Sequence, residues 1–360
     1  MRFSKKLIAT FFSDPSSHVT EFELIARYFT RPNRSALVGN GDDCAVIAPS
    51  AGNAFAVTTD TLIEGRHFLP TLDPEKLGRR VVNVNFSDLA AMGALPRYAL
   101  LSLTLPHIDE AWIARFSDGL WTVLDAYGVE LIGGNTTKGP LAIAMTAFGE
   151  LPPNVALTRS GARVSDELWV SGTLGDAGWA LYALQDPSMS VTPEQIAKYE
   201  CPEARVSLGL ALRGIAPSCI DISDGLLSEA RHIAAASNVS INIDIATIPT
   251  GLKHVSLQSL RDVAKMLVPS NISNIADNVW PAAFGPLSLH CLLRTGDAYE
   301  LLFTAPRDQR DAVAAILKHE QLPGACIGRV TALDAANPVR VLDAQSRVMD
   351  IEVKGWDHFV

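Results

Sequence analysis

Apolar residues along the chain fall into short blocks, which favour strands, and into longer stretches where they recur with helical spacing. The short blocks predict strands at 36–48, 54–59, 98–105, 141–151, 167–171, 218–222, 239–245, 299–304 and 325–330. The helical spacing predicts helices at 21–28, 74–93, 109–127, 176–185, 203–213, 225–237 and 307–319. Strands and helices mixed in this way along one chain predict an α/β or α+β fold.

The chain of 360 residues is long enough for two domains of ordinary size. A strand pattern ends at Leu151, and the pair Pro152-Pro153 after it cannot continue a strand. We therefore expect an N-terminal extension and two domains, with the boundaries 1–20, 21–151 and 152–360. Segment 265–289 contains three prolines among Ser, Asn and Asp residues, which predicts a loop-rich insertion in the second domain.

Composition narrows the possible partners. Hydrophobic residues make up 48% of the chain and charged residues 19%, which suits a globular protein. The net charge is −9 and no basic run exceeds two residues, so a nucleic-acid partner is disfavoured. No stretch approaches the roughly 20 apolar residues that span a bilayer, so no membrane partner is expected. The five cysteines form no C-x-x-C pair, which favours a reducing cytoplasm over a disulfide scaffold or a structural zinc site.

Aspartates recur where strand patterns end and turns begin. They are Asp42, Asp43, Asp60, Asp221 and Asp224, each beside apolar residues. A lone carboxylate beside a core is costly unless it is paired or binds a metal ion. Magnesium prefers hard oxygen ligands, so these positions indicate a magnesium site, although any single one could instead be a cap or turn residue.

Asp88 is the aspartate that a capping role does not explain. At 100° per residue, Leu77, Val81, Val84, Asp88 and Met92 fall within one arc of the helix predicted at 74–93. Asp88 therefore lies on the apolar stripe in the middle of a helix. We expect such an inward-facing carboxylate to have a cation beside it.

Two glycine-rich segments, 133–139 and 171–178, follow strand patterns and are predicted as turns. Glycine allows backbone N–H groups to approach phosphate oxygens, but neither segment matches a Walker A or G-x-G-x-x-G motif, and turn formation is the better explanation for each segment taken alone. Arg159 could bind a phosphate or a surface carboxylate. His67 has no Ser-His-Asp or Cys-His context, so the sequence makes no case for a covalent nucleophile.

The chain contains nine short motifs, which in chain order are GDDCAV, TTDTLIEGRHF, NFSDLAAMGALP, LIGGNTTKGPL, TRSGA, SGTLGDA, IDISDGL, AYELLF and KGWDHF. Together these motifs resemble the thiamine-monophosphate kinase family. The resemblance extends from about residue 22 to residue 359. It implies an aminoimidazole ribonucleotide synthetase-like fold, with an N-terminal mixed α/β domain that forms a homodimer and a C-terminal α/β domain. It also implies the final step of thiamine diphosphate synthesis, in which ATP phosphorylates thiamine monophosphate directly and without a phosphoenzyme.

The resemblance also implies roles for individual residues. The expected ligands of several Mg²⁺ ions are Asp43, Thr58, Thr59, Asp60, Asp88, Asn135, Asp221 and Asp224. The expected ATP contacts are Gly134, Asn135, Arg159 and Ser223, and the expected substrate contacts are His67, Asp297 and Trp356. An aromatic side chain such as that of Trp356 suits a cationic thiazolium or a pyrimidine ring.

The chain departs from the family pattern at two places. Asn135 stands where the family has Asp, and GGEDYEL is replaced by TGDAYEL, which shortens one acidic side chain at Asp297 and removes the next at Ala298. Both changes predict weaker metal binding or weaker substrate positioning. They leave open an alternative, a divergent or catalytically impaired member of the family that binds nucleotide or thiamine phosphate without efficient turnover.

Overall fold

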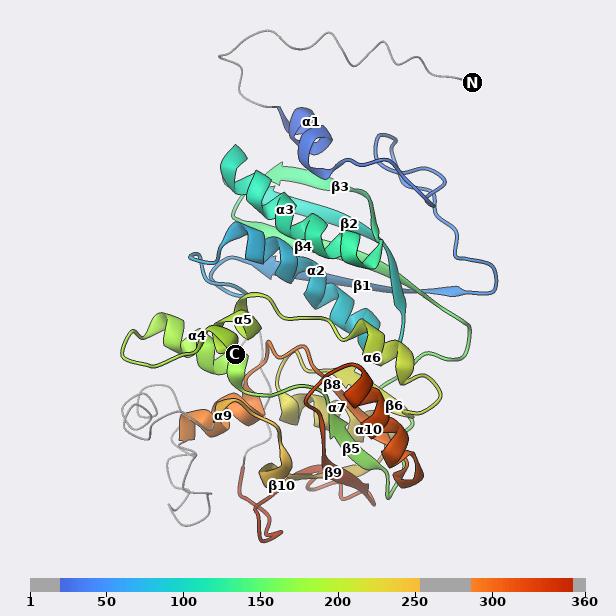
Figure 1. Cartoon of the computed structure of the whole chain (residues 1–360), viewed down its shortest axis with the longest axis vertical. Coiled ribbons are helices and arrows are strands. Elements are labelled where there is room, and N and C mark those ends of the chain that lie inside the picture. The colour runs from blue at the N-terminus through green and yellow to red at the C-terminus, as the bar shows by residue number, and fades with distance from the viewer. Residues whose placement is uncertain (1–19, 253–285, 352–360) are drawn as a thin grey trace.

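The computed structural model describes residues 20–252 and 286–351. Two β-sheets follow one another along the long axis of the molecule, each packed against its own helices (Figure 1). The α/β (α+β) fold class predicted from the sequence is confirmed. Within the described ranges, none of the helices has the length and apolar character needed to cross a bilayer.

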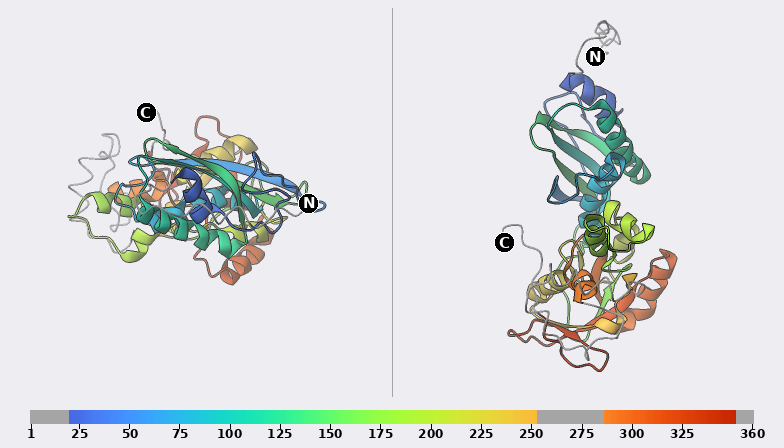
Figure 2. Two further views of the ribbon diagram at one scale, coloured as in Figure 1. Left: turned by 90° about the horizontal axis from the view of Figure 1, so that it is seen from above. Right: turned by 90° about the vertical axis from the view of Figure 1, so that its left-hand side faces the viewer.

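The N-terminal sheet has four strands in the order β1-β4-β2-β3. The strands are β1 (Ala54–Ile63), β2 (Leu95–Leu105), β3 (Glu130–Lys138) and β4 (Ala142–Leu151). Strand β4 pairs antiparallel with β1 and β2, whereas β2 and β3 are parallel and are therefore joined by a crossover helix. Figure 2 (right) shows that the helices cover one face of this sheet only.

Helices α2 (Pro74–Ala91) and α3 (Glu110–Tyr127) form that covering layer, after the short α1 (Glu21–Leu24) and a π-helical turn η1 (Ile25–Phe29). Helix α2 begins at an Asp73 cap whose side chain accepts the N–H of Glu75, with proline at the first position. Where α2 and α3 cross, the added Cβ of a larger residue at Gly78 would lie 2.1 Å from the carbonyl oxygen of Phe116. The glycine therefore permits the close approach of the two helices.

The C-terminal sheet has the strand order β10-β7-β9-β5-β8-β6 and is mainly antiparallel. Its strands are β5 (Glu167–Val170), β6 (Ser218–Asp221), β7 (Ser240–Asp244), β8 (Leu301–Ala305), β9 (Ala325–Thr331) and β10 (Val339–Leu342). The helices of this half are α4 (Asp176–Gln185), α5 (Pro193–Glu200), α6 (Val206–Ala211), α7 (Leu226–Ser237), α9 (Pro286–Arg294) and α10 (Arg310–His319). Two short 3-10 turns add η2 (Ile245–Thr247) and η4 (Arg307–Gln309).

Several elements differ from the sequence predictions. The strand predicted at 36–48 is wrong: Val38 and Val46 form one isolated bridge across an exposed loop, because the polar GNGDDC run between them forms a turn. The turn predicted at 133–139 is also wrong, since most of this segment belongs to β3 and pairs with β2. Short elements with weak patterns, α5, α9 and β10, were not predicted. Most of the insertion predicted at 265–289, and the extension predicted at 1–20, lie outside the described residues.

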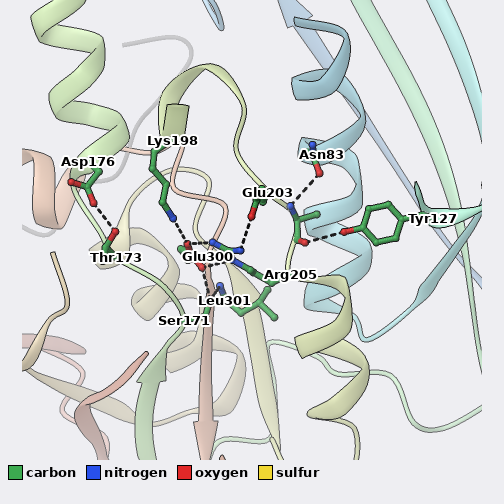
Figure 3. A network of polar contacts seen from close by, with 11 residues as sticks. Asn83, Tyr127, Ser171, Thr173, Asp176, Lys198, Glu203, Arg205, Glu300 and Leu301 are labelled. Atoms are coloured by element: carbon green, nitrogen blue, oxygen red, sulfur yellow. Dashed lines mark hydrogen bonds and ion pairs between the residues drawn. The ribbon is translucent and has the colours of Figure 1, made fainter. Parts of the chain in front are cut away.

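The stretch that leads into α6 joins the α2–α3 layer of the N-terminal half to the C-terminal half. Asn83 of α2 accepts the backbone N–H of Ala204 at 3.3 Å, and the Tyr127 hydroxyl at the end of α3 donates to the Ala204 carbonyl at 3.4 Å (Figure 3). The backbone of this one residue is therefore fixed by both helices of the N-terminal layer. The side chain of the next residue, Arg205, extends into the C-terminal half (Figure 3).

Arg205 binds the buried carboxylate of Glu300, just before β8. Its Nε and Nη2 lie 2.7 and 2.6 Å from the two carboxylate oxygens of Glu300, a paired geometry that suits guanidinium. Lys198 adds a bond of 2.9 Å and the Ser171 hydroxyl one of 2.7 Å (Figure 3). Burial alone would raise the pKa of Glu300, but the bonds and charges of Arg205 and Lys198 hold it below its usual value.

We predict that Glu300→Gln lowers the free energy of unfolding by about 3 kcal/mol, because Arg205 loses its buried counter-charge. Urea denaturation measures the change. Glu203→Gln is the matched control, since Glu203 pairs with the same arginine but its side chain is 79% exposed, and it should have no measurable effect. Equal effects of the two substitutions would contradict the importance of the buried pair.

Candidate functional site

Helix α2 lies between the two sheets and brings acidic side chains from both into one region. The Thr58 hydroxyl on β1 donates to the Asp88 carboxylate on α2, and the N–H of Asp60 donates to the Asn85 side chain at 3.2 Å. The Ser87 hydroxyl, one residue before Asp88, donates to Asp221 at the end of β6 at 2.7 Å. Neighbouring positions on one helix thus contact acidic residues of two separate sheets, through the backbone of Asp60 and the carboxylate of Asp221.

We name Asp60, Asp88, Asp221 and Asp224 the carboxylate cluster. Burial raises the pKa of Asp60 to about 6, and the charges of Asp88 and Asp224 add to the effect. Burial also raises the pKa of Asp221 to about 7, with repulsion from Asp88 and Asp60. Burial raises the pKa of Asp88 as well, although the Thr58 hydrogen bond opposes the rise. These carboxylates are therefore ionised only at a cost, which a cation would remove.

The donor set of the cluster suits magnesium, because carboxylate and hydroxyl oxygens are hard ligands. In the part of the chain that the structure describes, no three Asp, Glu, His or Cys side chains converge closely enough to hold an ion by themselves. Magnesium commonly completes its shell with water and with substrate phosphate oxygens. The cluster accordingly fits a Mg²⁺ ion that arrives with a phosphate ligand better than a closed structural metal site.

Glu229 supports the turn that carries Asp224, and the sequence did not identify it. Its Oε1 accepts the N–H of Asp224 at 3.1 Å, and the turn passes through Gly225 at φ +117°. Burial raises the pKa of Glu229 to about 9, and the Asp224 charge contributes. Glu229 is therefore neutral at pH 7 and adds no charge to the carboxylate cluster. Its position in the first turn of α7, next to the SDG motif, is the sequence feature that could have identified it.

A second group of predicted residues lies elsewhere, around a cavity of about 1100 Å³. The cavity is lined by Asp43, Gly134 and Asn135, together with apolar side chains such as Phe29. Gly134 is required here, because an added Cβ would lie 1.8 Å from the Leu101 carbonyl oxygen. From the sequence we expected the glycines of this segment to let backbone N–H groups approach a phosphate. In the structure, Gly134 lets β3 lie close to the neighbouring strand β2.

The structure of one chain does not unite this group with the carboxylate cluster. Asn135 lies on edge strand β3, and β1 is the opposite edge, three strand spacings or about 14 Å away. Thr59 points to the opposite face of β1 from Thr58 and Asp60, because successive side chains alternate. Its hydroxyl donates to the Met145 carbonyl at 3.1 Å.

Two predicted ATP contacts lie near the carboxylate cluster. Arg159 is exposed. Burial raises the pKa of Asp88, and the Thr58 hydrogen bond and then the Arg159 charge oppose this rise. Ser223 is exposed between Asp221 and Asp224, and its carbonyl accepts the N–H of Asp297 at 3.0 Å. Both side chains are thus accessible to a ligand at the cluster.

Two predicted substrate contacts, His67 and Asp297, bind the same residue. Arg80 of α2 donates to the His67 carbonyl at 3.3 Å and forms an ion pair with the Asp297 carboxylate. The sequence pattern alone did not single out Arg80. At 100° per residue, Arg80 lies about 40° from Val84 around the helix, at the border of the apolar arc that contains Asp88. Trp356 lies outside the described residues.

Two family models match this chain, one in its N-terminal half and one in its C-terminal half. The family model of the AIR synthase related protein, N-terminal domain, matches residues 41–151. That of the AIR synthase related protein, C-terminal domain, matches residues 163–338. Together they cover most of the chain.

Proteins that resemble this chain include thiamine-monophosphate kinases. The thiamine-monophosphate kinase of Escherichia coli (strain K12) is 40% identical over 347 residues, covering 94% of this chain and 98% of the relative. The crystal structure of the enzyme from Stenotrophomonas maltophilia K279a is 37% identical, with a TM-score of 0.73 over 91% of this chain and 96% of that one. AaThiL complexed with AMPPCP and TMP is 30% identical, with a TM-score of 0.67 over 89% and 91%. The resemblance seen in the sequence is confirmed: the chain belongs to the thiamine-monophosphate kinase family.

Proposed function

We propose that this protein transfers the terminal phosphoryl group of ATP to thiamine monophosphate, giving ADP and thiamine diphosphate, the final step of thiamine diphosphate synthesis. The observation that carries the proposal is the carboxylate cluster, in which α2 brings acidic residues of both sheets together and burial raises the pKa of Asp60 and Asp221, an arrangement that supports a bound cation. Family membership supplies the substrates, since AaThiL was solved with AMPPCP and TMP. The five cysteines are all free thiols, which suits a cytoplasmic location.

The carboxylate cluster and the Thr58 hydroxyl would hold Mg²⁺ as the site's cofactor. Bound there, magnesium would supply positive charge that offsets the negative charge of the transferred phosphoryl group. The chain's own contribution is position. The hydroxyls of Thr58 and Ser87 fix the directions of the Asp88 and Asp221 carboxylates, and Asn85 holds the backbone at Asp60, so little rearrangement is needed when the substrates bind.

The residues around the cluster assign one side to each substrate. Arg159 and Ser223 are exposed beside the cluster and suit the phosphates of ATP. His67 and Asp297, held together by Arg80, suit the thiamine end, to which Trp356 would add an aromatic surface. We propose that transfer is direct and in line, with the residues assembled here positioning the two reactants.

We further propose that the protein is a homodimer built on the face of the N-terminal sheet that α2 and α3 leave uncovered. Val57 and Ile63 of β1 point to that face and are 59% and 42% exposed. Apolar strands exposed in this way indicate an interface. Thr59 and Asn135 lie on the same face, so a second copy would place them at the interface and give a role to the residues that one chain keeps apart from the carboxylate cluster.

The alternative is a family member that binds its ligands without efficient turnover. It rests on Asn135 and Ala298, each of which removes a negative charge from the family pattern. Ala298 is packed against the core of the C-terminal half, so this position presents no polar group to a ligand. Tight binding of thiamine monophosphate without ADP release would favour this alternative.

A first prediction from the carboxylate cluster concerns how the stability of the metal-free protein depends on pH. The folded-state pKa values of Asp60 and Asp221, about 6 and 7, lie above the ordinary value of 3.8. Between these values the folded chain binds more protons than the unfolded chain, so stability falls as pH rises from about 4 to 7. Thermal unfolding with a chelator measures this slope. Asp221→Asn should flatten the slope and the exposed Asp118→Asn should not; equal slopes in all three proteins would contradict the assigned repulsion.

The second prediction tests the activity. ADP release, measured with a coupled assay, should require both Mg²⁺ and thiamine monophosphate, and chromatography should find thiamine diphosphate. Asp88→Asn should lower kcat about a hundredfold or more, because a charge that faces the phosphoryl group is lost. Asp118→Asn, on the exposed surface of α3, should retain activity. Near-normal turnover of Asp88→Asn would rule out the role given to the cluster.

The third prediction tests the dimer. Val57→Lys should give a monomer at micromolar concentration in analytical ultracentrifugation, because it places a charge in the proposed apolar interface. Val164→Lys changes a valine that is equally exposed, at 55%, and lies outside the N-terminal sheet. It should leave the dimer intact. A monomeric wild-type protein, or dissociation of both variants, would contradict the assigned face.

A further inference from the structure

Arg80 is an almost fully buried arginine at the meeting point of three segments. Only 1% of its side chain is exposed. Its Nη1 donates to the Tyr199 carbonyl at the end of α5, and its Nη2 donates to the His67 carbonyl and the Asp297 carboxylate. The guanidinium carbon also lies 5.1 Å from the centre of the Tyr199 ring. A buried cation with acceptors from three directions fixes all three in place.

The segment around Asp297 needs such support because its backbone is strained. Asp297 and Tyr299 have φ values of +63° and +49°, in the left-handed region that residues with side chains rarely adopt. Their N–H groups donate to the carbonyls of Ser223 and Ile222, at 3.0 and 2.8 Å. The strained segment therefore lies alongside the loop that carries Asp221 and Asp224, and Arg80 holds it from the side of α2.

The ion pair uses only one oxygen of the Asp297 carboxylate. Arg80 and the Tyr299 hydroxyl, the latter at 3.4 Å, both bind Oδ1. No hydrogen bond from the described residues reaches Oδ2, and the side chain is 27% exposed. A carboxylate anchored through one oxygen and open at the other has a fixed direction and a free acceptor.

The loop that carries His67 is fixed from the same place. Besides the bond from Arg80 to the His67 carbonyl, the Tyr199 hydroxyl accepts the N–H of Leu69 at 3.2 Å. Tyr199 is itself held by Arg80 through its carbonyl. Two loops that are about 230 residues apart in sequence therefore depend on one side chain of the helix that also carries Asp88.

We propose that Arg80 is a positioning residue for the thiamine end of the site. This inference rests on the proposed function, because it gives His67 and Asp297 their roles. Arg80 and Asp88 lie eight residues apart on α2, about 12 Å along its axis. The helix thus sets the distance between the carboxylate cluster and the substrate loops. Arg80 acts through Asp297 and His67 and does not itself contact the substrate, since it is buried.

Hydrogen exchange followed by mass spectrometry tests the proposal without any ligand. In Arg80→Met, peptides covering 296–300 and 64–69 should exchange at least about tenfold faster than in the wild type. Arg79→Met is the matched control, because Arg79 is the neighbouring residue, is 39% exposed and, among the described residues, forms its ion pair with Glu75 along the helix. It should exchange like the wild type. Unchanged protection of both peptides in Arg80→Met would overturn the proposal, whether or not the protein is a kinase.

Steady-state kinetics gives the second readout. Arg80→Met should raise KM for thiamine monophosphate and lower kcat/KM about a hundredfold, with KM for ATP nearly unchanged. Arg80→Lys should recover only part of this loss, because an ammonium lacks the planar fork. Combining Arg80→Met with Asp297→Asn should cost little more than either change alone. Additive losses, or equal effects on both substrates, would overturn positioning through Asp297; a wild type without product would instead refute the proposed function.

Discussion

The burial of carboxylates close to one another is the constraint on which the junction of this protein depends. Asp60 and Asp88 come from the N-terminal layer and Asp221 and Asp224 from the C-terminal layer, so their repulsion acts across the junction of the two halves. The fold opposes it locally, with hydroxyl donors from Thr58 and Ser87. The opposition is incomplete, as the raised pKa values show. Cations that bind together with phosphates would offset the remaining repulsion between the carboxylates.

Elsewhere the junction is held by ion pairs. Arg80 with Asp297 joins α2 directly to the segment before β8. Arg205 with Glu300 binds the same segment to the stretch that follows Ala204, whose backbone is held by α2 and α3. These pairs keep the two halves in register. Under the proposed function, arginines of the chain fix the frame of the site, and the cations for the reaction would come from outside.

Much of this arrangement could be predicted from the sequence, for identifiable reasons. Asp88 was found because a carboxylate on the apolar arc of a helix conflicts with the pattern around it. The 36–48 strand failed because its apolar ends are interrupted by polar turn residues, and β3 was missed because its glycines imitate a turn while its pairing with β2 is non-local. Arg80 and Glu229 were missed because their importance lies in partners more than 200 residues away, or in burial that local patterns do not reveal. The division of the predicted site residues into two groups depends on sheet order, which the sequence does not encode locally.

If the carboxylate cluster is a cation site that spans both halves of the protein, substitutions in either half should weaken binding of the same ions. A titration with Mn²⁺ as a substitute for Mg²⁺, in the presence of a non-hydrolysable ATP analogue, tests this, with free Mn²⁺ measured by electron paramagnetic resonance. The wild type should take up Mn²⁺, and Asp88→Asn and Asp221→Asn, one from each half, should both lose a large part of that uptake. Uptake that is the same in all three proteins would contradict a shared site.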